Sequence, residues 1–252
     1  MISVTSLDGS YQPKADLLKG RTILITGSGD GIGKELALSA AQHGANLVLL
    51  GKTQAKLEAL YDQIETSTQS KPIICPVDLE TLDDSQAKEI AEAIQAEFGA
   101  LDGLVHNAAI LGQRKPIQCY STAAWQSVMQ VNVNAGFLLS KALIPLMTES
   151  SDARMLFTSS GVGRTGIAYW GAYSVSKFAV EGLAQLLADE LTETTNIRVN
   201  AVNPGATRTS MRATAFPAEN PAGVRSAEDL MAGYLYLLGP DSKDISGQSI
   251  DI

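Results

Sequence analysis

The stretch TILITGSGDGIG, residues 22–33, decides the fold of this chain. Its first five residues, Thr22–Thr26, favour a buried strand, and the glycine-rich turn after them leads into a helical pattern that ends near His43. At such a turn, backbone N–H groups and the helix dipole can hold a pyrophosphate. The stretch therefore favours a dinucleotide-binding strand–turn–helix unit, although a glycine-rich turn alone is also compatible with a tight connection.

Apolar strands and helices alternate along the rest of the chain. We expect strands at residues 47–50, 72–77, 103–106, 154–158, 197–203 and 248–252, and helices near residues 54–65, 83–98, 125–147 and 172–192. This alternation indicates a parallel sheet covered on both faces, with ligands at the carboxyl ends of the strands. We predict a single α/β domain over residues 1–252, a Rossmann-type doubly wound sheet of about seven strands. The segment 205–225 breaks the alternation and is predicted to form a substrate lid.

Composition argues against several classes of function. With 252 residues, 45% hydrophobic and 18% charged, the chain suits one large soluble domain. The net charge of −8, without a long basic run, argues against nucleic acid and anionic membranes as partners. Cys75, Cys119, His43 and His106 form no ligand set, so no metal is expected. Without a leader pattern or an apolar run of about 20 residues, we expect a cytoplasmic protein with reduced cysteines.

Tyr173 and Lys177 lie four residues apart in an expected helix, which places phenol and ammonium one turn apart on the same face. Lowering a phenol pKa by roughly two or three units needs about 3–4 kcal/mol of anion stabilisation, and one close cation in a partly desolvated cleft could supply it. The spacing is also that of a packed ring beside a solvated amine. The pair is therefore a candidate acid–base group that depends on the rest of the chain for support.

Several motifs together resemble the classical short-chain dehydrogenase/reductase family. The glycine turn reads Thr-Gly-x-x-x-Gly-x-Gly, as in this family, rather than the plainer Gly-x-Gly-x-x-Gly. Residues 106–109, HNAA, resemble the family's Asn-Asn-Ala-Gly segment, and residues 204–205 resemble its turn beside the nicotinamide. Asn132 and Ser160, the latter 13 residues before Tyr173, resemble its asparagine and serine. The resemblance spans nearly the whole chain, and some segments look most like one group of bacterial oxidoreductases: residues 11–14, 129–134 and 169–173.

The resemblance implies a catalytic tetrad of Asn132, Ser160, Tyr173 and Lys177. Tyr173 would exchange a proton with the substrate oxygen while the nicotinamide exchanges a hydride with the carbon. Lys177 would lower the tyrosine pKa and hold the nicotinamide ribose, Ser160 would polarise the carbonyl, and Asn132 would anchor a water that links Lys177 to solvent. The structural alternative is that Ser160 ends a strand and Asn132 satisfies backbone groups in its helix.

The expected cofactor is NADP(H) rather than NAD(H). Lys52 and Thr53 follow the second strand without a carboxylate, so Lys52 can meet a 2′-phosphate as a point charge. Lys52 also reads as an ordinary surface lysine, and Asp30 adds an unfavourable negative charge nearby. Asp78 resembles the family's adenine contact and could equally cap the next segment. The implied cofactor-binding residues are Gly27, Ser28, Asp30, Gly31, Ile32, Gly33, Lys52, Thr53, Asp78, Leu79, Asn107, Ala108, Tyr173, Lys177, Pro204, Gly205, Thr207 and Thr209.

Two features depart from the family pattern. Ala109 replaces the usual glycine, and we expect the loop to absorb its methyl group. The sequence stops at residues 250–252, where many relatives continue into a tail that packs across a subunit interface. A homodimer or homotetramer is expected by resemblance, through the helices at 125–147 and 172–192, although packing on the sheet would also explain their apolar stripes.

The substrate is expected to be a small carbonyl or alcohol compound. Six apolar or aromatic residues are expected around the reacting carbon and suit a medium-sized apolar ketone or aldehyde: Ile110, Leu111, Tyr169, Trp170, Met211 and Phe216. Five cations in the same loops leave an anionic substrate open: Arg114, Lys115, Arg164, Arg208 and Arg212.

Other classes of function are weaker readings of the same sequence. A non-catalytic regulator that senses NADP(H) could lose the tyrosine or lysine without consequence, yet this chain has the whole tetrad. Sugar-nucleotide chemistry of the family's extended branch needs a larger substrate domain than the roughly fifty residues after Pro204 allow. The cofactor preference favours reduction, although the tetrad itself serves both directions.

Overall fold

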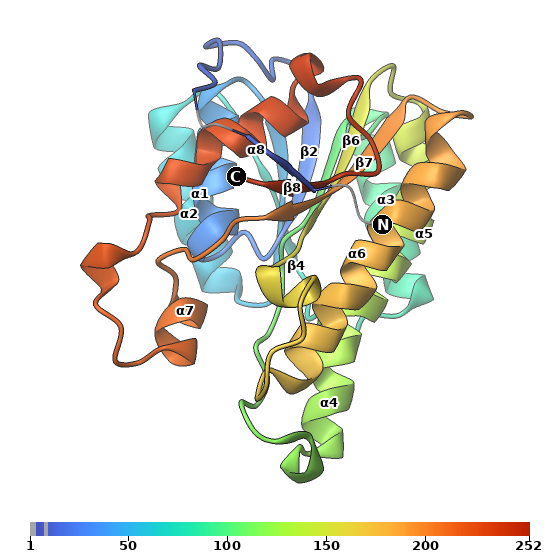
Figure 1. Cartoon of the computed structure of the whole chain (residues 1–252). Coiled ribbons are helices and arrows are strands. Elements are labelled where there is room, and N and C mark those ends of the chain that lie inside the picture. The colour runs from blue at the N-terminus through green and yellow to red at the C-terminus, as the bar shows by residue number, and fades with distance from the viewer. Residues whose placement is uncertain (1–3, 8–9) are drawn as a thin grey trace.

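The computed structural model describes residues 4–7 and 10–252, and these residues contain one eight-stranded sheet whose neighbouring strands all pair in parallel (Figure 1). Its spatial order is β1-β8-β7-β6-β5-β2-β3-β4. The strands are β1 Val4–Ser6, β2 Thr22–Thr26, β3 Asn46–Gly51, β4 Ile73–Pro76, β5 Gly103–His106, β6 Ala153–Thr158, β7 Ile197–Asn203 and β8 Ser249–Asp251. The order reverses between β2 and β5, so a crevice forms at their carboxyl ends, where doubly wound sheets bind ligands.

The predicted Rossmann-like architecture is confirmed. Two buried apolar clusters lie on opposite faces of the sheet: α3, α5 and α6 contribute to one, and α1, α2 and α8 to the other (Figure 1). The α-helices are α1 Gly31–Gln42, α2 Gln54–Ser67, α3 Asp84–Phe98, α4 Thr122–Met129, α5 Ala135–Thr148, α6 Gly171–Thr192, α7 Ser210–Ala215 and α8 Met231–Leu238. Most predicted boundaries agree to within two residues, which is the usual scatter of such ends.

The strand β1 was not foreseen in the N-terminal lead-in. Val4–Ser6 pairs in parallel with Ser249–Asp251 of β8, and its three residues are all exposed. A three-residue exposed strand carries neither an apolar run nor a clear alternation, so the sequence offered no signal for it. The sheet consequently has eight strands, where about seven were expected.

The helix expected at 125–147 is interrupted. A π-helical segment, Gln130–Asn134, joins α4 to α5 and contains Asn132. Such segments are uncommon inside helices and occur often at functional sites. Among the described residues, the combined run Thr122–Thr148 is the one helix long and apolar enough, by composition, to cross a membrane. It packs against α3 and α6 in the fold, as the core helix of a globular protein does.

The segment 205–225 leaves the sheet after β7 and returns close to its starting point. Thr207 and Arg225 form an isolated bridge, and Arg208 N donates to Arg225 O at 2.8 Å. The excursion carries α7, which Figure 1 places away from the helices that cover the sheet. Its two ends are therefore joined while its middle projects beside the carboxyl ends of the strands.

Candidate active site

The glycine turn after β2 is fastened to the end of β5. Thr26 Oγ1 accepts from the backbone N–H groups of Asn107 and Ala108, each at 3.0 Å. A Cβ on Gly27, whose φ is +67°, would lie 2.9 Å from Ala108 Cα. A Cβ on Gly33 would lie 2.4 Å from Gly27 O. Only glycines permit this close packing of the turn, the helix and the neighbouring strand.

Asp30 is less unfavourable for an anionic ligand than expected. Its side chain accepts from Gly31 N at 2.7 Å, which caps α1. Its other oxygen lies 2.6 Å from Lys56 Nζ, and this hydrogen bond is the main reason that the pKa of Asp30 is lowered. The cation offsets the negative charge that the sequence places in the turn.

Lys52 and Asp78, for which the sequence suggests separate roles, form one ion pair. Lys52 Nζ lies 2.8 Å from Asp78 Oδ2, and both residues line the main cavity. The hydrogen bond from Lys52 lowers the pKa of Asp78, and Asp78 Oδ1 also accepts from Glu80 N at 3.1 Å, as a capping aspartate does. The pair is solvent-exposed, so it holds Lys52 weakly and leaves it able to meet another anion.

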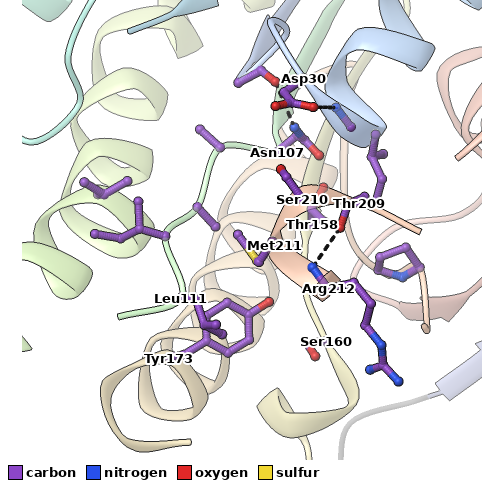
Figure 2. A pocket seen from close by; sticks show the side chains of 18 of the residues that line it. Asp30, Asn107, Leu111, Thr158, Ser160, Tyr173, Thr209, Ser210, Met211 and Arg212 are labelled. Carbon is purple, nitrogen blue, oxygen red and sulfur yellow. Dashed lines mark hydrogen bonds between the residues drawn. The ribbon is translucent and has the colours of Figure 1, made fainter. Parts of the chain in front are cut away.

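Three members of the expected tetrad come together at the far end of that cavity. Ser160 follows β6, while Tyr173 and Lys177 lie one turn apart on α6. Ser160 lies close enough to Tyr173 to lower the pKa of its phenol, and Lys177 Nζ donates to Thr158 O at 2.6 Å. In Figure 2, Tyr173 and Ser160 lie at one end of the pocket and Asp30 and Asn107 at the other.

The expected lowering of the Tyr173 pKa is wrong for this structure. Burial raises the pKa of Tyr173 to about 12, and the hydrogen bond with Ser160 only partly offsets it. The Lys177 ammonium is directed at Thr158 O and lies 5.5 Å from the centre of the tyrosine ring. Burial also lowers the pKa of Lys177 to about 8, while the charge of Glu181 raises it. Desolvation therefore outweighs the attraction on which the sequence argument relied.

Asn132 connects the loop after β5 to α6 through side-chain hydrogen bonds. Its Oδ1 accepts from Ile110 N at 2.8 Å, and its Nδ2 donates to Ile110 O and to Ser176 Oγ, each at 3.0 Å. The side chain thus satisfies backbone groups, but those of the loop after β5 and not of its own helix. Asn132 and Lys177 both border a second, internal cavity of about 10 Å³, the size of one water molecule.

Apolar side chains form the substrate end of the main cavity. Ile110, Leu111, Trp170, Met211 and Phe216 line it as expected. Tyr169 does not: it is 58% exposed, has a φ of 72° and is absent from the lining. Its left-handed backbone turns its own side chain outward while the next residue points inward.

The loop cations do not form a free anion site. Arg164 pairs with Asp251 at 2.6 Å, away from the cavity. Arg212 does line the cavity, but Glu219 neutralises it through two hydrogen bonds of 2.6 and 2.7 Å. Arg114 stacks 4.6 Å from the Trp170 ring centre. The cluster that the sequence suggested is therefore dispersed or already paired.

The main cavity joins the two halves of the site in one space of about 400 Å³. It is lined by most of the expected cofactor residues as well as by Ser160, Tyr173 and Lys177. Ser28, Gly33, Thr53 and Asn132 are not in its lining; Ser28 Oγ instead donates to Leu50 O at 3.2 Å. Ala109 lines the cavity without a positive φ, so its methyl group causes no backbone strain. An elongated, mixed cavity with a glycine turn at one end fits a dinucleotide.

Sequence reasoning missed two residues close to the tetrad. Ser159 lines the cavity, and its hydroxyl donates to Glu181 Oε1 at 2.5 Å. Glu181 lies four residues after Lys177, a spacing that puts both on one face of α6. This spacing of four residues could have identified Glu181 from the sequence as a neighbour of Lys177.

The family model described as short chain dehydrogenase matches residues 21–220. The chain belongs to the short-chain dehydrogenase family. Within this family, the uncharacterized oxidoreductase YciK of Escherichia coli (strain K12) is 46% identical over 241 residues, covering 96% of this chain and 95% of YciK. The suspected similarity to the YciK-type bacterial group is thereby confirmed, and the protein is an oxidoreductase of this family.

Two solved structures of short-chain dehydrogenases are similar over almost their full length. One, from Shigella flexneri 2a and in complex with NADP, is 45% identical, has a TM-score of 0.92, and covers 94% of this chain and 99% of its own. The other, from Escherichia coli CFT073 and in complex with NADPH, is 46% identical, has a TM-score of 0.92, and covers 95% and 99%. Both relatives carry the cofactor form that the sequence favours.

Proposed function

We propose that this short-chain dehydrogenase reduces an uncharged, apolar ketone or aldehyde with NADPH. The observation that carries the proposal is the single cavity that runs from the Lys52–Asp78 pair to the hydroxyls of Ser160 and Tyr173. When bound, the nicotinamide supplies the hydride. The NADP and NADPH complexes of the two similar structures support this choice of cofactor.

This chain's own residues would hold the cofactor along the cavity. Backbone N–H groups of the glycine turn would hold the pyrophosphate, and Lys52 would leave Asp78 to meet the 2′-phosphate. Lys177 would hold the ribose hydroxyls of the nicotinamide half. Other expected contacts stay predictions: Ser28, Ile32, Thr53, Leu79, Asn107, Ala108, Pro204, Gly205, Thr207 and Thr209.

Tyr173 would act as the general acid in this direction. Its phenol is protonated at neutral pH, as donation to a substrate oxygen requires, but a pKa raised by burial to about 12 makes it a weak acid, so the phenolate that forms needs stabilisation by its neighbours. Ser160 would hold that oxygen, and the Lys177 ammonium would stabilise the phenolate that forms. Lys177 would then reprotonate the Tyr173 phenolate, and a water in the small cavity beside Lys177 and Asn132 would pass a replacement proton from solvent to the lysine.

The substrate end of the cavity favours an apolar carbonyl compound. Its walls are Ile110, Leu111, Met211, Trp170 and Phe216, and Arg212, which also lines the cavity, is already paired with Glu219. We propose that the segment 205–225, which contributes Met211, Arg212 and Phe216 to the lining, acts as a lid. The test is NADPH oxidation with matched pairs of an apolar ketone and a keto acid of equal chain length. The ketones should give the higher kcat/KM, and a consistent preference for the keto acids would reject the substrate class.

Replacing Lys52 by Ala should change cofactor preference. We expect the KM for NADPH to rise about tenfold, because a charged contact to phosphate is lost, while the KM for NADH stays within about twofold. Steady-state kinetics with both cofactors gives the ratio. Lys88→Ala is a matched control, since Lys88 is also exposed and pairs with Glu92 at 3.5 Å. An unchanged NADPH/NADH ratio in Lys52→Ala would contradict the assignment.

The working assembly is proposed to be a homo-oligomer. Exposed apolar side chains remain on α5 and α6, namely Phe137 at 50%, Phe178 at 43% and Leu186 at 55%. Large exposed apolar groups on neighbouring helices are typical of contact surfaces. Light scattering should show that Leu186→Glu reduces the particle mass to a monomer, whereas Ile117→Glu, at an exposed residue of the short 3₁₀ helix Ile117–Cys119, does not. A wild type that is already monomeric would reject this proposal.

A cytoplasmic location is also proposed. The two cysteines, Cys75 and Cys119, are free, as in proteins of reducing compartments. Fractionation of the source cells would test it, and recovery in a membrane or exported fraction would contradict it.

A further inference from the structure

Glu181 is a buried carboxylate on the catalytic helix α6 for which the proposed reaction has no use. It is 1% exposed and lies four residues after Lys177. Its Oε1 accepts from Ser159 Oγ at 2.5 Å and from Ser249 Oγ at 2.8 Å. Its Oε2 is buried and has no hydrogen-bond partner among the described residues. Burying a carboxylate costs free energy, so its position next to the tetrad calls for a reason beyond packing.

The first reason lies in the end of β6. Ser159 stands between Thr158, whose carbonyl accepts from Lys177 Nζ, and Ser160, whose hydroxyl faces Tyr173. Ser159 N donates to Val202 O of β7 at 2.7 Å, and its hydroxyl donates to Glu181. Glu181 therefore holds, through one short hydrogen bond, the three residues that carry the acceptor of Lys177 and the hydroxyl of Ser160.

The second reason is electrostatic. Lys177 is fully buried, and the charge of Glu181 counteracts the lowering of the Lys177 pKa by burial. The other titratable groups next to Lys177 are neutral near pH 7: burial lowers the pKa of His106, on β5, to about 3 and raises that of Tyr173 to about 12. On the far side of Glu181, Arg164 Nε lies 3.5 Å away, and Arg164 is itself paired with Asp251 of β8.

We propose that Glu181 is a positioning residue of the active site: it holds the end of β6 through Ser159, and its carboxylate, one turn of α6 from Lys177, favours the ammonium form of that lysine. The catalytic consequence rests on the proposed function, whereas the contacts and the charge state of Lys177 do not. Glu181 thereby also joins the C-terminal strand β8, through Ser249, to the catalytic helix.

A titration of Lys177 in the cofactor-free protein tests the electrostatic part. In protein with ¹³C-labelled lysine, the Cε signal of Lys177 is identified by its absence in Lys177→Arg. The wild-type midpoint is expected near the pKa of about 8. In Glu181→Gln the midpoint should move to lower pH, and in Glu190→Gln, which removes the same charge from an exposed site on α6, it should not move. A folded Glu181→Gln with the wild-type midpoint would overturn the proposal.

Turnover then tests the catalytic consequence. For Glu181→Gln the loss of kcat should grow with pH. If the midpoint falls by about one pKa unit, the loss should reach about fivefold at pH 8, because the charged fraction of Lys177 would fall from about one half to about one eleventh. Absence of turnover in the wild type would reject the proposed function, whereas the titration would still test the effect of Glu181 on Lys177. If Glu181→Gln does not fold, Ser159→Ala is tested in its place. In that variant, hydrogen exchange of the backbone amides at residues 158–160 should become at least tenfold faster. Unchanged exchange there would overturn the proposal.

Discussion

Replacing Tyr173 by Phe is expected to lower kcat for carbonyl reduction by about 10³-fold and to leave the Kd for NADPH within about threefold. The substitution removes the hydroxyl that would protonate the substrate oxygen. It keeps the ring, whose centre lies 5.7 Å from that of Trp170 and 5.5 Å from Lys177 Nζ. Steady-state turnover and a fluorescence titration of NADPH measure the two quantities.

Tyr169→Phe is the matched control for this variant. Tyr169 is also a tyrosine and lies in the turn just before α6, but its side chain is 58% exposed and does not line the cavity. Removal of the Tyr169 hydroxyl should leave kcat unchanged. Retention of more than a tenth of wild-type kcat in Tyr173→Phe would show that another group donates the proton.

Replacing Gly33 by Ala is expected to have the second largest effect, on both stability and cofactor binding. The new Cβ would lie 2.4 Å from Gly27 O and 2.6 Å from Asn107 Nδ2, so the turn or the end of β5 must move. Overpacking of this kind costs about 1–3 kcal/mol, or about 5 °C in Tm for a chain of this size. Because the same turn would hold the pyrophosphate, we expect the Kd for NADPH to rise by at least about tenfold.

Gly166→Ala provides the comparison for Gly33→Ala. Gly166 is an exposed glycine without a positive φ, it does not line the cavity, and a Cβ there would have nothing within 4 Å. Alanine at such an open position should leave Tm unchanged or raise it slightly. Equal melting temperatures and equal NADPH affinities for the two alanine variants would mean that the close packing at Gly33 is not required for stability or for cofactor binding.

Much of the fold was predictable because its signals are local and repeated. The apolar run Thr22–Thr26, the glycines after it and the later strand–helix alternation dictate a parallel sheet with ligands at the strand ends. The positions of Ser160, Tyr173 and Lys177 at one end of the cavity follow from the same order of elements. By contrast, β1 is too short and exposed to leave a pattern, and the π-helical segment around Asn132 depends on a contact with the distant loop residue Ile110.

The errors in the site share one physical cause: a sequence gives charges but not their partners or their burial. Tyr173 was expected to be acidified by Lys177, yet desolvation raises its pKa. Arg164 was counted as a possible anion site, yet it is paired with Asp251. The sequence shows that Glu181 follows Lys177 by four residues, but it does not show the contact of Glu181 with Ser159, which forms only when the end of β6 packs against α6.

The most direct test of the central claim is transfer of deuterium from NADPH labelled at the reactive ring carbon. The purified protein is incubated with each labelled epimer and a panel of apolar ketones and aldehydes, and the products are analysed by mass spectrometry. We expect an alcohol with one deuterium on the former carbonyl carbon, from one epimer only, and none with Tyr173→Phe. Tight binding of NADPH without any deuterated product across the panel would contradict the account and favour a protein that binds the cofactor as a sensor.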